Sequence, residues 1–507
     1  MILSHRQFTS LTKKVGLCLL VILILGALGS RLSGLQTLPR GLYVDESSIG
    51  YNAWSITQTG ADEHGISWPI YFKAFGEWKN PVFIYSQALL FLFLKPTVTS
   101  LRLGSSLWGI SGVLILGILA WMISKSKTVT LASVLLMLSN PWHWLQSRVV
   151  FEAISLPTVL LATFLCVYLF ETRQKLKYAY YVSLCAGLLF YTYTSARFLA
   201  PALIGIFCVL WLKKLKFNLV GVVSLFGIAL LPAYVWEKNF PGSLLFAYNR
   251  VSLGITTNEP WLLVKNLTQN YLLHWTPEFL FGSGDGYLRH MIGWHSGLLW
   301  ASLPVIFLGL IVVSKQLKHS SWAQFLWLSL LLAPLPSAIT TQAPHGIRSL
   351  AMLPILMIFG IYGWHYLVGE KLVKMSLLVV IFVAFGVEMT LMQHYLSQTY
   401  VETSTIWFES GAIEQFEVGK KLPPPYYLPD SYRESLLVSW LYLRQSEYQD
   451  QLLSQTDSQT SFITALPTQL KPGTYILNQS LCDQLKIKIN QFDLVYENYQ
   501  GCVAQVK

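Results

Sequence analysis

Charged residues are scarce in this chain of 507 residues: Lys, Arg, Asp and Glu together make up 12% of it, about half the share usual in soluble proteins. Hydrophobic residues make up 53%. The length alone would suggest about three soluble domains. The apolar composition excludes that, and it also excludes a disordered chain, a collagen and a small disulfide-linked scaffold. The sequence therefore predicts an all-α protein that crosses a membrane many times.

Cysteine is also rare, with six residues, and no CxxC pair or Cys/His spacing of a zinc site is present. Four cysteines lie in apolar runs and are expected to pack as small hydrophobic side chains: Cys18, Cys166, Cys185 and Cys208. Cys482 and Cys502 both lie in the C-terminal part. They pair if that part is extracytoplasmic, and they stay free in a reducing compartment. The sequence leaves both alternatives open.

The net charge of +11 does not indicate a nucleic-acid partner, because the excess has the distribution of a membrane protein. Residues 1–390 contain 28 basic and 13 acidic residues, whereas residues 391–507 contain 8 and 12. Basic residues collect on the cytoplasmic side of membrane proteins. We therefore expect a membrane part with cytoplasmic basic loops, followed by a mildly acidic soluble part.

Eleven apolar stretches are candidate membrane spans. They cover about residues 16–32, 103–123, 128–143, 153–170, 178–195, 198–212, 217–236, 297–314, 321–336, 349–369 and 375–392. A twelfth stretch, 82–94, is short for a span and predicts a re-entrant or interfacial helix. If 82–94 does not cross the membrane, every basic cluster lies on the same side of the membrane as the N-terminus. Because basic loops face the cytoplasm, that side is predicted to be cytoplasmic.

The expected organisation is a membrane domain over residues 1–393 and a small extracytoplasmic α/β domain over 394–507. Two long outer loops cover residues 34–81 and 237–296. Alternating segments such as 474–477 and 492–495 predict strands in the C-terminal domain, and 430–455 is typical of a helix. We expect a multi-pass protein of the plasma (inner) membrane, with a cytoplasmic N-terminus and an extracytoplasmic C-terminus.

The first outer loop contains adjacent carboxylates, Asp45 and Glu46. They suit general-base catalysis, but Asp45 can equally cap a helix that begins near Glu46. Further along, Asp62, Glu63 and His64 have the ligand types for a divalent ion, and they are also typical of a turn.

Three basic elements suit a lipid-linked phosphate. Lys79 precedes the short helix and either binds phosphate or extends to lipid headgroups. Arg148 either faces an anionic lipid phosphate, with Glu152 orienting it, or pairs with Glu152 across one helix turn. His345 and Arg348 lie near a helix start, where they bind phosphate or anchor the interface. The Gly-rich segment 282–286 lacks the Lys-Ser/Thr pair that ends a phosphate-binding loop, and it is expected to be a turn.

The order of these motifs resembles the bacterial family 39 branch of the GT-C glycosyltransferases, relatives of protein O-mannosyltransferases and of the lipid A aminoarabinose transferase. The resemblance covers roughly residues 10–390. The residues that carry it are Asp45-Glu46, Lys79-x-Pro81, Leu101-Arg102-Leu103, Ser147-Arg148 with Glu152, and Pro344-His345-x-x-Arg348-Ser349. The C-terminal part resembles no known family.

This resemblance implies a polyprenyl-phosphate-linked sugar donor, an extracytoplasmic protein, lipid or glycan as acceptor, and transfer of a hexose or pentose with inversion. It implies that Asp45 lies near acceptor and donor and that Lys79 meets the donor phosphate. Relatives often have Lys-Pro-Pro-Leu where this chain has Lys79-Asn80-Pro81-Val82, and some have Asp where it has Glu152.

The sequence hypothesis combines these assignments. Asp45 and Glu46 are the expected catalytic residues. The expected donor-phosphate ligands are Lys79, Arg148, His345 and Arg348, and the expected supporting residues are Glu152, Asp62 and His64. No metal ion or cofactor is required, although a divalent ion near Asp62, Glu63 and His64 is compatible with the residue types.

Two other classes of function compete. A transporter or flippase of lipid-linked sugars predicts ionisable residues inside spans and interrupted helices in two repeats, and few charges lie within these spans. A membrane scaffold whose tail binds a partner leaves the charged outer loops without a role. Within the transferase class, the acceptor is set by loops and stays open.

Overall fold

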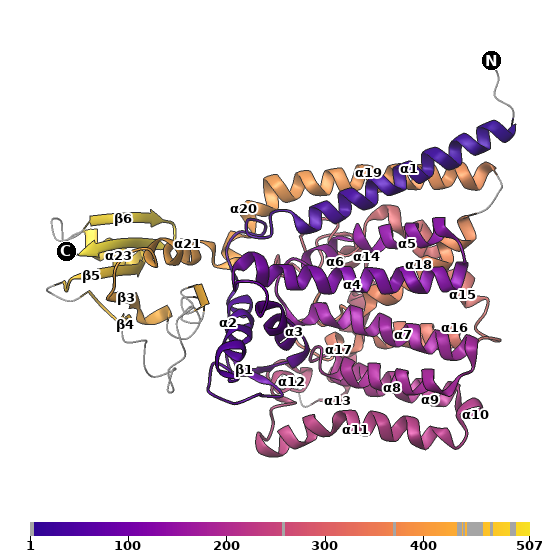
Figure 1. Cartoon of the computed structure of the whole chain (residues 1–507), viewed down its shortest axis with the longest axis horizontal. Helices are drawn as coiled ribbons and strands as arrows, with labels where there is room; N and C mark the ends of the chain where they lie inside the picture. The colour runs from indigo at the N-terminus through magenta and orange to yellow at the C-terminus, as the bar shows by residue number, and fades with distance from the viewer. Residues whose placement is uncertain are drawn as a thin grey trace. The chain divides into compact units, whose positions relative to one another are not determined.

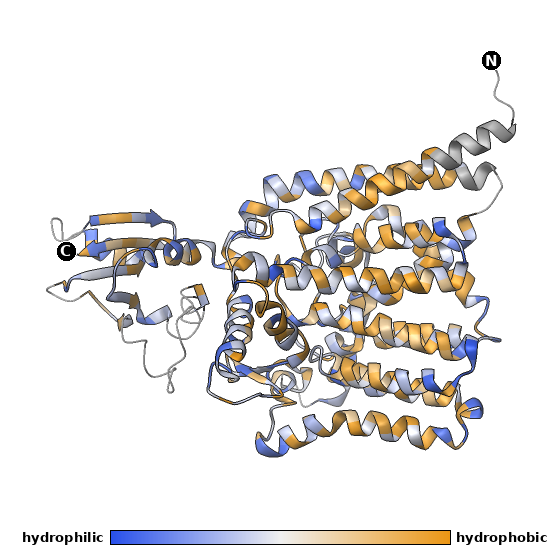
Figure 2. Ribbon diagram, viewed as in Figure 1, coloured by the Kyte–Doolittle hydropathy of each residue, from blue (hydrophilic) through white to orange (hydrophobic). Residues whose placement is uncertain are grey.

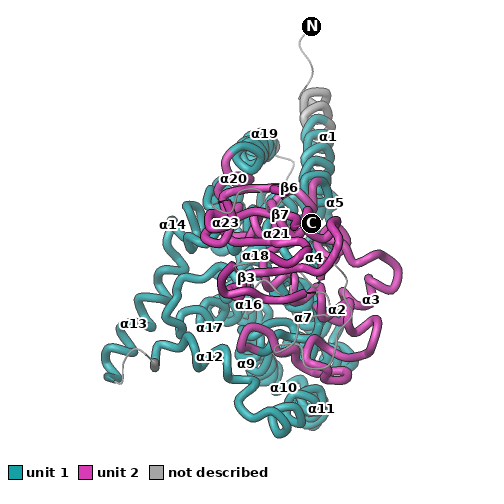
Figure 3. The backbone as a smooth tube through the Cα atoms, turned by 90° about the vertical axis from the view of Figure 1, so that its left-hand side faces the viewer, with its two compact units in different colours: residues 1–33, 78–83, 105–398 teal, residues 34–77, 84–104, 399–507 magenta. Residues whose placement is uncertain are grey.

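Helices make up most of the chain, and their faces are largely apolar (Figures 1 and 2). The structure is a computed structural model that describes residues 5–255, 259–368, 372–432, 439, 442–443, 460–466, 470–486 and 493–506. The chain forms two compact units (Figure 3). Unit 1 contains residues 1–33, 78–83 and 105–398, and unit 2 contains residues 34–77, 84–104 and 399–507.

Unit 1 is helical. Its helices are α1 (His5–Leu32), α5 (Lys127–Leu138), α6 (Pro141–Gln146), α7 (Ser155–Arg173), α8 (Leu176–Phe190), α9 (Ala196–Leu210), α10 (Leu212–Leu215), α11 (Asn218–Asn239), α12 (Phe246–Val251), α13 (Pro260–Leu273), α14 (Pro277–Phe281), α15 (Leu303–Ser314), α16 (Ser321–Leu332), α17 (Leu335–Ala338), α18 (Met352–Leu367) and α19 (Leu372–Tyr395). Helix α4 (Val98–Ser124) begins in unit 2 and continues in unit 1. Short 3-10 turns include η1 (Glu152–Ile154) and η3 (Trp300–Ser302).

Five helical stretches of the described chain are long and apolar enough to cross a membrane: Val15–Leu32, Val98–Ser124, Glu152–Arg173, Asn218–Asn239 and Ser376–Thr403. The remaining predicted spans also coincide with helices, but these are shorter, such as α5 and α16 with 12 residues each. Helix α3 (Pro81–Phe91) has 11 residues and occupies the stretch expected to form a short, non-spanning helix.

Small residues allow helices of unit 1 to pack closely. At Gly309 of α15 a side chain would collide with the carbonyl oxygen of Phe359, and at Gly363 of α18 it would collide with that of Val305. Close approach of backbones at small residues is typical of helix pairs in membranes, where burial of apolar surface adds little. The α15–α18 pair therefore depends on van der Waals contact at these glycines.

The C-terminal part of unit 2 contains a mixed sheet of strand order β4-β3-β5-β7-β6. Its strands are β3 (Tyr426–Pro429), β4 (Thr460–Ile463), β5 (Gly473–Asn478), β6 (Asp493–Asn498) and β7 (Gly501–Val506), and helices α21 (Ser410–Gly419) and α23 (Gln479–Lys486) accompany them. β3 is parallel to β4 and β5, while β7 is antiparallel to β5 and β6. The predicted small α/β fold is confirmed for the described residues, and most of the helix expected at 430–455 lies outside them.

A disulfide joins Cys482 of α23 to Cys502 of β7. Both cysteines are buried in a core that includes Tyr475, Leu477 and Leu485. Of the two alternatives that the sequence left open for this pair, the structure has the bonded one.

Unit 2 also contains the first outer loop, with α2 (Val44–Thr59) and the short strands β1 (Phe72–Ala74) and, at its boundary with unit 1, β2 (Glu77–Lys79). Residues from the C-terminal part pack on this loop. The backbone amide of Leu42 donates to the carbonyl of Phe408 at 2.8 Å. The buried Tyr442 lies against Gly50 of α2, and its hydroxyl donates to the carbonyl of Thr97 at 3.1 Å.

Candidate active site

Glu46 lies in the first turn of α2 and helps to fix it. Its side chain is fully buried and forms a two-pronged ion pair with Arg102, with Nε–Oε1 and Nη2–Oε2 distances of 2.9 Å. Its Oε2 also accepts from the backbone amide of Tyr43 at 3.0 Å. Arg102 donates further to carbonyl oxygens of the preceding loop, those of Leu35, Pro39 and Gly41. Glu46, which was expected to assist catalysis, therefore holds in place the loop that contains Asp45.

Asp45 lies one residue before this anchor and is partly buried. Helix α2 begins at Val44 with Tyr43 as the capping residue, so the alternative that Asp45 caps a helix starting near Glu46 was wrong. A carboxylate in the first turn of a helix interacts favourably with the helix dipole. Its position is fixed by the Glu46–Arg102 pair on the same helix turn.

The segment after α2 is a tight turn in which Asp62 is buried. Oδ1 of Asp62 accepts from the backbone amides of His64 at 2.9 Å and Ile66 at 2.8 Å. Glu63 accepts from Ser48 at 3.0 Å and from Asn52 at 2.9 Å. Burial raises the pKa of both carboxyls above their usual values.

His64 contacts the carbonyl oxygen of Lys73 through Nε2 at 2.9 Å. The side chains of Asp62, Glu63 and His64 thus have separate partners. Within the described part of the chain, the one set of converging metal-ligand atoms lies elsewhere. The turn alternative is supported here, and a divalent ion at this place is not.

The Lys79-Asn80-Pro81 element is held by Glu152. Asn80 is fully buried; its backbone amide donates to Oε2 of Glu152 at 2.9 Å, and its side-chain amide donates to Oε1 at 2.6 Å. Arg197 of α9 donates to Oδ1 of Asn80 at 2.9 Å. Lys79, at the end of β2, is 5% exposed. Sequence reasoning missed Arg197, because it precedes an ordinary apolar span.

Arg148 and Glu152 do not lie on one helix, so the predicted pair across a helix turn was wrong. Helix α6 ends at Gln146 and the 3-10 turn η1 begins at Glu152. The Arg148 side chain is fully buried, and Nη1 donates to the carbonyls of Ser30 at 2.7 Å and Arg31 at 3.0 Å, at the end of α1. Its guanidinium also lies 4.8 Å from the ring centroid of Trp144.

Arg31 is a second buried arginine in this region, and it too was missed from the sequence. Its Nη1 donates to Ser147 Oγ at 2.6 Å and lies 3.0 Å from Nδ1 of His143. Its Nη2 donates to the carbonyl of Leu138 at 2.7 Å. Arg31 of α1 and Arg148, which follows α6, thus place two buried guanidinium groups near the end of α1. An arginine within an apolar run was the available sequence signal.

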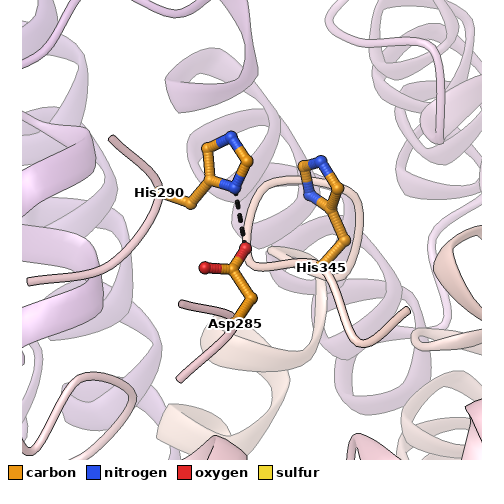
Figure 4. A group of neighbouring side chains, drawn as sticks. All are labelled: Asp285, His290 and His345. Carbon is orange, nitrogen blue, oxygen red and sulfur yellow. Dashed lines mark hydrogen bonds and ion pairs between the residues drawn. The ribbon is translucent and has the colours of Figure 1, made fainter. Parts of the chain in front are cut away.

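His345 and Arg348 belong to a turn before α18, and the structure brings His345 to residues of the second outer loop (Figure 4). Oδ2 of Asp285 lies 2.7 Å from Nδ1 of His290 and accepts from the backbone amide of Gly346 at 2.8 Å. The rings of His290 and His345 stack with centroids 4.3 Å apart. Burial, followed by His290 and Arg348, lowers the pKa of His345 well below its usual value.

Arg348 is partly exposed, and its Nη1 donates to Oγ1 of Thr340 at 3.0 Å. The expected turn at 282–286 is present, but the sequence did not indicate that Asp285 contacts the turn that begins at His345. An Asp and a His five residues apart in a Gly-rich loop were the only signal.

Neither a protein-family profile nor a curated protein sequence matches the chain. Solved structures do. ArnT from Cupriavidus metallidurans bound to undecaprenyl phosphate is 13% identical, with a TM-score of 0.52 over 99% of this chain and 98% of that one. ArnT in the apo state is 12% identical, with a TM-score of 0.55 over 96% and 97%. The chain shares the fold of ArnT. The resemblance to the GT-C glycosyltransferases that the sequence predicted is thereby confirmed at the level of the fold.

Proposed function

We propose that this protein is a membrane glycosyltransferase that moves a sugar from a polyprenyl-phosphate-linked donor to an extracytoplasmic acceptor, with inversion. The observation that carries the proposal is the fold shared with ArnT over nearly the whole of both chains, since one of those ArnT structures holds undecaprenyl phosphate. The acceptor is a protein, a lipid or a glycan, and the sugar is a hexose or a pentose.

The proposed transfer needs only two reactants, the lipid-linked donor and the acceptor. An acceptor hydroxyl attacks C1 of the sugar, the bond from C1 to the phosphate oxygen breaks, and polyprenyl phosphate leaves. Asp45 accepts the hydroxyl proton as general base. Glu46 supports this indirectly, because its ion pair with Arg102 holds the first turn of α2. The step requires no metal ion or cofactor, because the phosphate ester already activates the sugar.

Charge on the leaving phosphate is stabilised by basic residues, chiefly Lys79 and Arg348. His345 shapes the turn that carries Arg348, and its Nδ1 accepts weakly from the amide of that residue at 3.4 Å. Arg148 adds positive potential from a buried position. Glu152 is a positioning residue that holds Lys79 through Asn80, while Asp62 and His64 support the first loop.

The proposed topology is eleven spans in the plasma (inner) membrane with the N-terminus in the cytoplasm. It places both long loops and the C-terminal part on the outer side. The basic clusters of the sequence support this orientation.

The test is a comparison of cell-envelope glycans, glycolipids and glycoproteins by mass spectrometry in cells with and without the gene. We expect one glycan modification to disappear on deletion, to return with the parental gene and to stay absent with the Asp45→Asn gene. Purified protein in vesicles should then release polyprenyl phosphate from the donor when the identified acceptor is present. Movement of intact donor across the vesicle membrane without release of polyprenyl phosphate would instead establish the flippase.

A further inference from the structure

We propose that Asp285, His290 and His345 form a binding site for a divalent transition-metal ion of the Zn²⁺ type within unit 1. Each of these residues offers a ligand atom, and the three atoms lie within 4.8 Å of one another (Figure 4). Two imidazoles and one carboxylate are a ligand set that zinc uses, and they suit other first-row transition metals as well. The proposal does not depend on the glycosyltransferase reaction.

The three side chains are buried and already directed toward one another. The Asp285 carboxylate is 1% exposed, and the His290 ring is 10% exposed. Neighbouring groups fix the ligands: Tyr287 donates its backbone amide to Oδ1 of Asp285 at 3.0 Å, and Gln146 donates to the His290 carbonyl at 2.9 Å. Hydrogen bonds from neighbouring groups to the ligand residues are a regular feature of metal sites, because they orient the ligands.

A small adjustment of the ligand positions converts this arrangement into a coordination sphere. Zn–N and Zn–O distances of about 2.0–2.1 Å place tetrahedral ligands roughly 3.3 Å apart. Nδ1 of His290 and Oδ2 of Asp285 lie 2.7 Å apart, so they separate slightly around the ion, while ligand atoms up to 4.8 Å apart move closer. A metal-ligating imidazole presents a free lone pair, so any proton on a ligand atom is released to solvent on binding.

The ligand chemistry also selects the ion. Mg²⁺ and Ca²⁺ prefer oxygen ligands, whereas two imidazoles favour Zn²⁺ and its neighbours in the first row. Three protein ligands leave a fourth position of a tetrahedral ion for water or an anion oxygen. The site joins two segments far apart in the sequence: the loop that contains Asp285 and His290, and the turn from His345 to Ser349.

The experiment uses the full-length protein, purified in detergent without a polyhistidine tag and stripped with a chelator. After equilibration with Zn²⁺ and gel filtration, elemental analysis should find about one Zn²⁺ per chain. Zn²⁺ should raise the melting temperature of the stripped protein, and Mg²⁺ should not. His290→Ala should lose the bound Zn²⁺, whereas the matched control His319→Ala, at an exposed histidine outside the site, should retain it.

Because His290→Ala can also fail to fold, the unaltered protein provides the deciding measurement. Co²⁺ added to stripped protein should give the intense visible absorption of a four-coordinate ion, and equimolar Zn²⁺ should abolish it. A wild-type protein that keeps less than a tenth of an equivalent of Zn²⁺, or that gives only the weak spectrum of hydrated Co²⁺, would overturn the proposal. So would a folded His290→Ala protein that binds Zn²⁺ like the parent.

Discussion

Glu152 binds Asn80 with both carboxylate oxygens, one through the backbone amide and one through the side-chain amide. These residues are 72 positions apart in the sequence, and the bond fixes the backbone next to Lys79. In the proposed reaction, the position of the Lys79 ammonium depends on this contact. In that proposed reaction, Glu152 is thus a positioning residue for Lys79.

Glu152→Gln tests this dependence. The substitution places an amide N–H₂ against one of the two donors of Asn80, which removes at least one hydrogen bond to a charged group, worth about 1.5–3 kcal/mol. We expect roughly a tenfold loss or more of kcat/KM for the donor, in the same direction as Lys79→Ala. Glu388→Gln is the matched control, because Glu388 also accepts a backbone amide, that of Ala301 at 3.1 Å, outside the proposed site. An equal loss in both variants would contradict a specific role for Glu152.

Asp45→Asn should lower the rate of sugar transfer by about 10²–10⁴-fold, because it removes the general base and keeps the size of the side chain. The melting temperature should stay close to that of the parent, since Asp45 is neither the helix cap nor part of the Glu46–Arg102 pair. Transfer from the polyprenyl-phosphate donor at the parental rate would show that the proposed mechanism is wrong.

Glu46→Gln should act on stability more than on chemistry. It leaves Arg102 buried without its counter-charge, and breaking a buried pair in this way typically costs about 3–5 kcal/mol. Thermal unfolding in detergent should detect this loss. The double variant Glu46→Leu/Arg102→Met should be more stable than Glu46→Gln, because no uncompensated charge remains buried. A double variant that is less stable than the single one would show that an unpaired buried charge is not the main cause of the loss.

Reporter fusions test the topology. Fusions after Ser126, Lys175, Lys214 and Lys318 should report the cytoplasm, and fusions after Asp62, Gly284 and Ser458 should report the outer side. Ser458 lies outside the described residues, so this prediction comes from the sequence alone. A cytoplasmic signal at Ser458 would contradict eleven spans.

The disulfide allows a test by mass spectrometry. Freshly isolated protein should carry alkylating reagent on Cys482 and Cys502 only after reduction. Reduction should destabilise the C-terminal sheet by about 3 kcal/mol, the size expected for a closed loop of this length in the chain-entropy account. Two cysteines that react without reduction would mean that the bond is absent in the cell.

Properties that depend on local composition were predictable from the sequence. The apolar run at 103–123 predicted α4, which spans Val98–Ser124, and alternation at 474–477 predicted β5, which spans Gly473–Asn478. The first prediction rests on the length of an apolar run and the second on side-chain alternation, and both are local properties of the chain. The break between Arg148 and Glu152 was missed, because the residues between them are apolar and equally compatible with a continued helix.

Contacts between distant segments were not predictable in the same way. Asp285 and His345 were each noted in the sequence, but nothing in their spacing shows that one loop binds the other. Glu46 looked like a second catalytic carboxylate because its partner, Arg102, lies 56 residues away. Residue type identifies the chemistry that a side chain can perform, whereas its partners decide whether that chemistry is available.

Unit 2 is built from segments that the ribosome synthesises at different times, and this has a consequence for its folding. Its third segment, 399–507, follows the first two after a long stretch of chain, and the amide of Leu42 must wait for the carbonyl of Phe408, roughly 370 residues later. At about 5–20 residues per second, that delay is on the order of 20–70 s. During this interval the ion pair between Glu46 and Arg102 can already form, because both residues leave the ribosome early. The first loop can thus be ordered by its own charges before the end of the chain arrives to complete its packing.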